Sequence, residues 1–79
     1  VEIRRDRIRL RAVLDSTVAG LEGLSREADV RLELVHVDDV EVIGDADRLT
    51  QVFTNLISNA VKFSPKGSSV DISIVSEGN

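Results

Sequence analysis

Residues 44–67 read GDADRLTQVFTNLISNAVKFSPKG and contain the pattern that decides the fold. On a wheel of about 100° per residue, the apolar residues between Leu49 and Val61 spread across one side of a helix. The other side carries a narrow polar strip made by Arg48, Gln51, Asn55, Asn59 and Lys62. A merely solvated face would favour Lys and Glu, which form helices better than Asn. We therefore interpret the strip as a functional surface, with an ordinary solvated face as the alternative that spacing leaves open.

The chemistry of this strip suits a magnesium-bound phosphate. Asn55 and Asn59 each offer a carbonyl oxygen and two N–H donors, and Lys62 adds a point charge that pairs with phosphate. Mg²⁺ prefers oxygen ligands and usually retains waters and phosphate oxygens in its shell. The spacing therefore predicts a nucleotide lying along the helix.

The literal sequence adds a second argument. Residues 48–65 read RLTQVFTNLISNAVKFSP and closely resemble the N box of sensor histidine kinases. That family reads approximately D-x-x-R-L-x-Q-V-L-x-N-L-L-x-N-A-x-K-F-T/S-P. The resemblance covers about residues 4–76, and its matching positions are Asp45, Arg48, Asn55, Asn59, Ala60, Lys62, Phe63 and Pro65.

By this resemblance Asn59 is the Mg²⁺ ligand and Asn55 contacts phosphate or supports the metal site. Lys62 reaches the phosphates of ATP, and Phe63 lines the nucleotide pocket. Each residue also has a structural alternative: a satisfied amide for Asn55, a surface lysine for Lys62 and a core position for Phe63.

Gyrase-type, mismatch-repair and chaperone ATPases of the same superfamily place Glu, a general base, at the first N-box position. This chain has Asn55 there. An amide does not accept a proton at neutral pH. The sequence therefore favours a site that holds ATP for transfer over one that activates water.

The chain departs from the family in what it lacks. We expect residues 1–79 to be a partial ATP-binding domain that ends before the family's Asp-x-Gly-x-Gly motif, and the later lid motifs are absent too. The chain has one histidine, His36, and it lacks the acidic and basic setting of a phosphoacceptor. We expect it to be an exposed residue at a strand end, and the chain alone to be inactive.

Composition excludes several other classes. With 79 residues and no cysteine, the chain is at most one small domain without disulfides or thiolate metal sites. Residues 1–11 carry a local charge of +3, which leaves −7 for the remainder of a chain whose net charge is −4. We expect no nucleic-acid binding, because the acidic remainder has few aromatic residues. We also expect no direct membrane contact and a cytoplasmic location, with any membrane anchor elsewhere in the parent protein.

Hydrophobic periodicity predicts the elements. A short strand is expected within residues 1–5, an amphipathic helix over 10–28, and strands over 30–34 and 40–43. Asp45 is the expected cap of a second helix, which Phe63 closes because Pro65 excludes Ser64 from helical geometry. A type I turn is expected over 64–67, followed by a strand over 70–74.

The alternating strands predict a sheet with one buried face, covered by the two helices. The expected fold is a two-layer α/β sandwich with a mixed or antiparallel sheet, a partial Bergerat-type ATP-binding fold. Missing strands would leave an open edge and uncovered apolar helix surface. We therefore expect a homodimer or association with the remaining part of the domain.

The function expected from the resemblance is the ATP- and Mg²⁺-binding portion of a two-component sensor histidine kinase. Such a parent transfers phosphate from ATP to a histidine and then to an aspartate of a response regulator. Two alternatives stay open: a non-catalytic interaction module or degenerate kinase remnant, and a serine kinase of the anti-sigma type.

Overall fold

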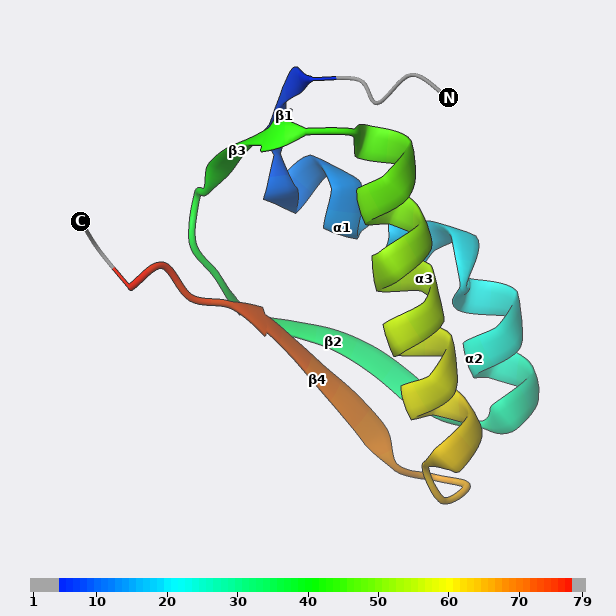
Figure 1. Ribbon diagram of the computed structural model, residues 1–79. Helices are drawn as coiled ribbons and strands as arrows, with labels where there is room; N and C mark the ends of the chain where they lie inside the picture. Colours follow the sequence, from blue (N-terminus) through cyan, green and yellow to red (C-terminus); the bar gives the residue numbers. More distant parts are fainter. Residues whose placement is uncertain (1–4, 78–79) are drawn as a thin grey trace.

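The computed structural model describes residues 5–77. Its elements follow in the order β1 (Asp6–Arg9), α1 (Leu10–Gly20), α2 (Glu22–Ala28), β2 (Arg31–Val37), β3 (Glu41–Gly44), α3 (Ala46–Phe63) and β4 (Ser69–Ile74). β1 pairs antiparallel with β3, and β2 pairs parallel with β4. Figure 1 shows the short β1–β3 pair near the start of α3 and the longer β2–β4 pair beside the helices.

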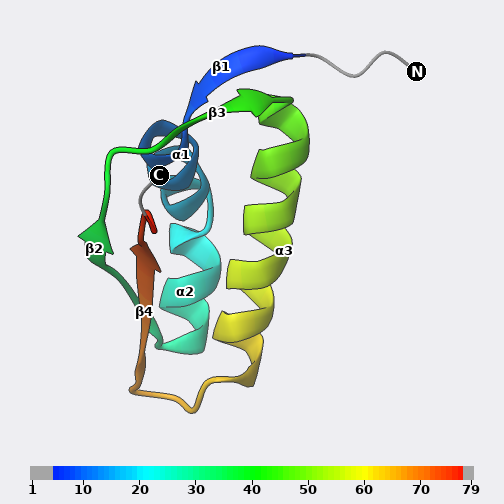
Figure 2. The same cartoon turned by 60° about the vertical axis from the view of Figure 1, so that its left-hand side comes forward.

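The helices gather on one side of the β2–β4 pair, which gives two layers (Figure 2). Along β4, Val70, Ile72 and Ile74 are half-buried, whereas the residues between them are exposed. This alternation is the period of two that a strand with one covered face requires. The expected two-layer α/β fold is thus confirmed, with its strands divided into one antiparallel and one parallel pair.

The expected first helix is two helices. α1 ends at Gly20 and α2 begins at Glu22, with Leu21 between them at φ −102° and ψ 4°. Gly20 and Gly23 each weaken a helix by up to about 1 kcal/mol relative to Ala, so the break falls where propensity is lowest. The expectation of one uninterrupted helix over 10–28 is wrong for this reason.

The β2–β4 register is set by two turns that meet at one end of the pair. Asp29 ends α2 in the left-handed region at φ 55°, where Val30 N–H donates to the Ser25 carbonyl in a Schellman-type closure. The Asp29 carbonyl accepts from Gly67 N–H at 2.7 Å, and Arg31 N–H donates to the Ser68 carbonyl at 3.0 Å. These hydrogen bonds therefore align the first residues of the two strands, so that Arg31 pairs with Ser69.

The turn before β4 begins one residue later than expected. Ser64 still donates its N–H to the Val61 carbonyl as the C-cap of α3, so the hydrogen-bonded turn runs from Pro65 to Ser68. Gly67 occupies its third position at φ 87°. A positive φ there is the type II signature, so the expected type I turn over 64–67 is wrong.

The first strand lies at Asp6–Arg9, whereas residues 1–4 of the expected strand over 1–5 lie outside the described residues. Ile8 is the buried residue of this strand and pairs with Val42. Its arginine neighbours face carboxylates: Arg7 lies 3.6 Å from Glu41. Such exposed pairs stabilise by less than about 1 kcal/mol each, so burial of Ile8 dominates.

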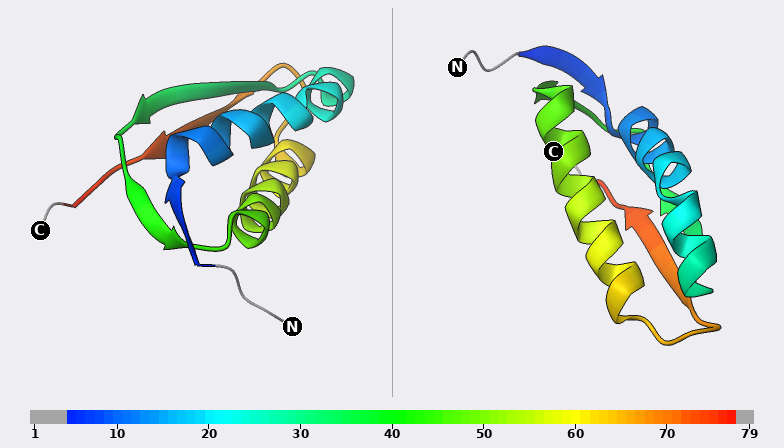
Figure 3. Two further views of the ribbon diagram at one scale, coloured as in Figure 1. Left: turned by 90° about the horizontal axis from the view of Figure 1, so that it is seen from above. Right: turned by 90° about the vertical axis from the view of Figure 1, so that its right-hand side faces the viewer.

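A small core joins the helices to both strand pairs. It consists of Ile8, Val13, Leu14, Val30, Ile57 and Val61. Buried Thr17 donates its hydroxyl to the Val13 carbonyl at 2.8 Å, so its polar group is satisfied within α1. α3 packs against α1 and α2, which run side by side with it (Figure 3, right). Ile57 and Val61 are the α3 residues that this packing buries.

Asp38 ties the chain after β4 back to the end of β2. One carboxylate oxygen accepts from Ser76 N–H at 2.7 Å, and the other lies 2.7 Å from His36 Nε2. The Ser76 hydrogen bond, followed by the His36 contacts, lowers the pKa of Asp38 below its ordinary 3.8. His36 is exposed near the end of β2, as the sequence predicts.

The cap of α3 gives the first prediction. Asp45 accepts hydrogen bonds from Asp47 N–H and Arg48 N–H. Asp45→Ala should lower the free energy of unfolding by about 1 kcal/mol. Asp45→Ser should lower this free energy by much less, because a Ser side chain also caps a helix. Urea unfolding followed by circular dichroism measures this. Equal losses in both variants would contradict the capping role.

Asp38 gives a pH prediction. Because its pKa is lowered in the folded state, its contribution is complete above pH 3.8 and is lost as pH falls through the folded pKa. The urea midpoint should therefore fall less between pH 6 and pH 3 in Asp38→Asn than in wild type. Ser76→Pro, which removes the donor, should show the same reduced acid dependence. An unchanged acid dependence in both variants would contradict the contact.

Candidate functional site

α3 presents three different surfaces around its axis. Its buried surface centres on Ile57 and Val61. The polar strip on the other side, which we call the amide strip, consists of Arg48, Gln51, Asn55, Asn59 and Lys62, all exposed. On a wheel of about 100° per residue, an apolar strip lies between the amide strip and β4. This exposed apolar strip consists of Val52, Leu56 and Phe63, which are 51%, 63% and 85% exposed.

The structure brings Asn55, Asn59 and Lys62 together. With about 1.5 Å of rise per residue, the two amides lie about 6 Å apart along the axis and about 40° apart around it. Lys62 follows in the last turn of α3. Among the described residues, none of these three side chains forms a hydrogen bond or an ion pair with protein. The alternative of a satisfied structural amide for Asn55 therefore has no support in the described part of the chain.

Phe63 lies at the C-terminal end of α3 and is 85% exposed. No described element covers its ring, so the core alternative for this residue has no support in residues 5–77. Its expected role in lining a nucleotide pocket stays a prediction.

The N-terminus of α3 is not available to bind an anion. Helix N-termini attract phosphate through free N–H groups and the helix dipole. Here the Asp45 carboxylate already accepts from Asp47 N–H and Arg48 N–H, and Asp47 adds a second negative charge. A phosphate would therefore meet the amide strip and Lys62 along the side of α3.

The donor set of the strip fits a hard cation shared with a ligand. Within residues 5–77, no group of three or more His, Cys, Asp or Glu residues is arranged to hold a metal. An Asn carbonyl oxygen supplies one ligand, so phosphate oxygens and water would complete a magnesium shell. A cation at Asn59 would thus bind together with a phosphate.

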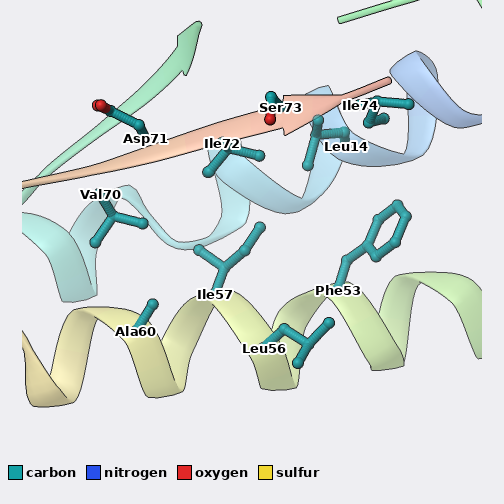
Figure 4. A pocket seen from close by; sticks show the side chains of 10 residues that line it. All are labelled: Leu14, Phe53, Leu56, Ile57, Ala60, Val70, Asp71, Ile72, Ser73 and Ile74. Atoms are coloured by element: carbon teal, nitrogen blue, oxygen red, sulfur yellow. The ribbon is translucent and has the colours of Figure 1, made fainter. Parts of the chain in front are cut away.

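An apolar groove separates α3 from β4. Its volume is about 360 Å³, and its walls are Phe53, Leu56, Ile57 and Ala60 from α3 and Val70, Ile72 and Ile74 from β4, with Leu14 also lining it. Figure 4 shows Ile57 and Phe53 of α3 pointing toward Val70 and Ile72 of β4 across the groove, whereas Asp71 points away from α3. None of the four expected site residues lines this groove.

Comparisons with known proteins support the family resemblance seen in the sequence. Residues 44–79 match the sequence profile of the histidine kinase-, DNA gyrase B- and HSP90-like ATPases. The chain is 42% identical over 60 residues to a probable histidine kinase 6 of Oryza sativa subsp. japonica, covering 73% of this chain and 6% of that protein. It is 43% identical over 65 residues to the signal transduction histidine-protein kinase BarA of Escherichia coli, covering 80% of this chain and 7% of BarA.

Solved structures give the same result. The cytoplasmic segment of the histidine kinase QseC superposes with a TM-score of 0.85 at 28% identity, covering 90% of this chain and 48% of that one. The mycobacterial sensor histidine kinase MprB superposes with a TM-score of 0.78 at 28% identity, covering 94% and 48%. The chain thus spans about half of these structures and less than a tenth of the two curated relatives.

These similarities identify the chain as part of an ATPase domain of the histidine kinase family. In the part of the chain that the structure describes, no helix is long and apolar enough to cross a membrane.

Sequence reasoning found the amide strip but missed two features of the β2–β4 pair. The Asp38 contacts join residues 38 positions apart, and neither residue type marks such a pair in sequence. The parallel register places Glu33 beside Asp71, which also depends on tertiary structure. The groove corresponds to the uncovered apolar helix surface that the sequence analysis predicts.

Proposed function

We propose that Asn55, Asn59 and Lys62 of the amide strip bind the phosphates and magnesium ion of ATP. The observation that carries this proposal is that Asn55, Asn59 and Lys62 share one exposed side of a helix and have no protein partner within the described residues. Asn is a poor helix former, so two exposed Asn residues on one helix side favour a ligand that uses them, and Lys62 adds a charge that pairs with phosphate. The family profile supports ATP as that ligand.

In this proposal Asn59 holds the cation through its carbonyl oxygen. Asn55 contacts phosphate one turn earlier, and Lys62 neutralises phosphate charge. Phe63, exposed beside Lys62, packs against the nucleotide. Bound Mg²⁺ would neutralise the charge that develops on the phosphates during transfer.

For the parent protein we propose phosphoryl transfer from ATP to a histidine and onward to a response-regulator aspartate. Asn55 supports transfer over hydrolysis, since it occupies the position where related ATPases carry a Glu base and it does not accept a proton near neutral pH. Acid-labile product phosphate distinguishes a histidine kinase from the serine-kinase alternative.

Binding of ATP to the isotope-labelled chain, followed by NMR with and without Mg²⁺, tests the site. Asn59→Ala should abolish the strengthening of ATP binding by Mg²⁺ and leave metal-free binding intact. Lys62→Ala should weaken both by about tenfold, because it removes a charge-assisted contact to phosphate.

Gln51→Ala is the matched control, since it lies on the same exposed strip and should change neither affinity. If Asn59→Ala keeps the full effect of Mg²⁺, the metal-ligand role is wrong. If Lys62→Ala and Gln51→Ala bind ATP equally, the strip does not recognise phosphate.

A further inference from the structure

α2 contributes no buried residue to the core, although it lies between two buried positions. Its seven residues are all half-buried or exposed. Thr17 is buried in α1 before it, and Val30 is buried directly before β2. Segments with few buried apolar contacts open at the lowest free energy. The core therefore fixes the chain on both sides of α2 more firmly than it fixes α2 itself.

At both ends of α2 the chain leaves helical geometry. Leu21 precedes the helix at φ −102° and ψ 4°, and Asp29 follows it in the left-handed region at φ 55°. Terminal positions of this kind absorb the dihedral changes of a hinge. A helix of seven residues is also too short to be stable by itself in water. α2 is thus a short helix bounded by two hinge positions.

Gly23, inside α2, is not required by the shape of the fold. Its φ is not positive, and a Cβ placed on it would meet no atom within 4 Å. An alanine would therefore fit at this position without strain. A glycine in the interior of a helix lowers the stability of that helix relative to alanine. The consequence of Gly23 in this structure is a less stable α2.

Backbone hydrogen bonds connect α2 to the C-terminal end of α3. Val30 N–H donates to the Ser25 carbonyl at 3.0 Å, which closes the turn at Asp29. The Asp29 carbonyl in turn accepts from Gly67 N–H at 2.7 Å, four residues after Phe63. Figure 1 shows α2 beside the C-terminal half of α3. Loss of the last turn of α2 would therefore displace the acceptor of Gly67, close to the end of the amide strip.

We propose that α2 opens locally between Leu21 and Asp29 while the rest of the fold stays intact, and that a nucleotide bound at Lys62 holds it closed. The second part rests on the proposed function of the amide strip. A ligand that needs the closed turn at Gly67 binds the closed form more tightly. By linkage, that ligand shifts the equilibrium of α2 toward the closed form.

Hydrogen exchange followed by NMR, without nucleotide, tests the local opening. The amides of Ser25 and Val30 should share one protection factor, roughly tenfold or more below that of Val61 in the buried surface of α3. Val30 is buried as a residue and its N–H is hydrogen-bonded. Its rapid exchange would therefore report opening of α2 and not simple exposure.

Two matched helix variants separate α2 from the rest of the fold. Gly23→Ala should raise the protection factors of Ser25 and Val30 about fivefold, because alanine stabilises α2. Ser16→Ala is the control, since it raises helix propensity at an exposed position of α1. It should leave the exchange of Ser25 and Val30 unchanged.

Mg-ATP at saturation tests the coupling to the amide strip. It should raise the protection factors of Ser25 and Val30 roughly fivefold or more, while shifts in the signals of Asn59 and Lys62 report that ATP is bound. If those signals shift and the protection factors stay unchanged, the coupling is wrong and the proposed function stands. If the signals do not shift, the proposed function and the coupling both fail, whereas exchange without nucleotide still decides whether α2 opens.

Two results would overturn the local opening of α2. The first is an equal protection factor for Ser25 and Val61, since both amides would then exchange only through global unfolding. The second is an equal effect of Gly23→Ala and Ser16→Ala on Ser25, because α2 would then not open separately from α1.

Discussion

Burial of Ile57 and Val61 fixes the rotation of α3, and the other surfaces of this chain follow from that rotation. With these two side chains turned toward the core, helical geometry leaves the amide strip facing solvent. The apolar strip of Val52, Leu56 and Phe63 then lies between the amide strip and β4. Burying two aliphatic side chains stabilises by about 1.5–3 kcal/mol each, which exceeds any single exposed ion pair in the fold.

The two strand pairs hold α3 at both ends. At its start, Asp45 caps the helix directly after β3, whose partner β1 carries buried Ile8. At its end, the turn through Gly67 is joined to the end of α2 by a hydrogen bond to the Asp29 carbonyl. The amide strip therefore lies on a helix whose termini are positioned by backbone contacts, as a preorganised binding surface requires.

α3 was the most predictable element. Its periodicity, the Asp45 cap and the Pro65 stop are all local signals, and they gave both its ends and its exposed amides. Two other boundaries were predicted wrongly for local reasons. The break at Leu21 reflects two weak glycine positions within a continuous apolar pattern, and the Gly67 turn moved by one residue because Ser64 still closes α3. The pairing of β2 with β4 and the position of Glu33 beside Asp71 followed only from the tertiary structure.

We propose that Asn55, Asn59 and Lys62, and not the groove, receive the nucleotide. Mn²⁺ in place of Mg²⁺ tests this most directly, because a paramagnetic ion broadens NMR signals of nearby residues and takes the same oxygen ligands. With ATP present, we predict broadening centred on Asn59 and extending to Asn55 and Lys62, and its loss in Asn59→Ala. Broadening centred on Leu56 and Ile72 in the groove, or on the carboxylates of Glu33 and Asp71, would contradict the account.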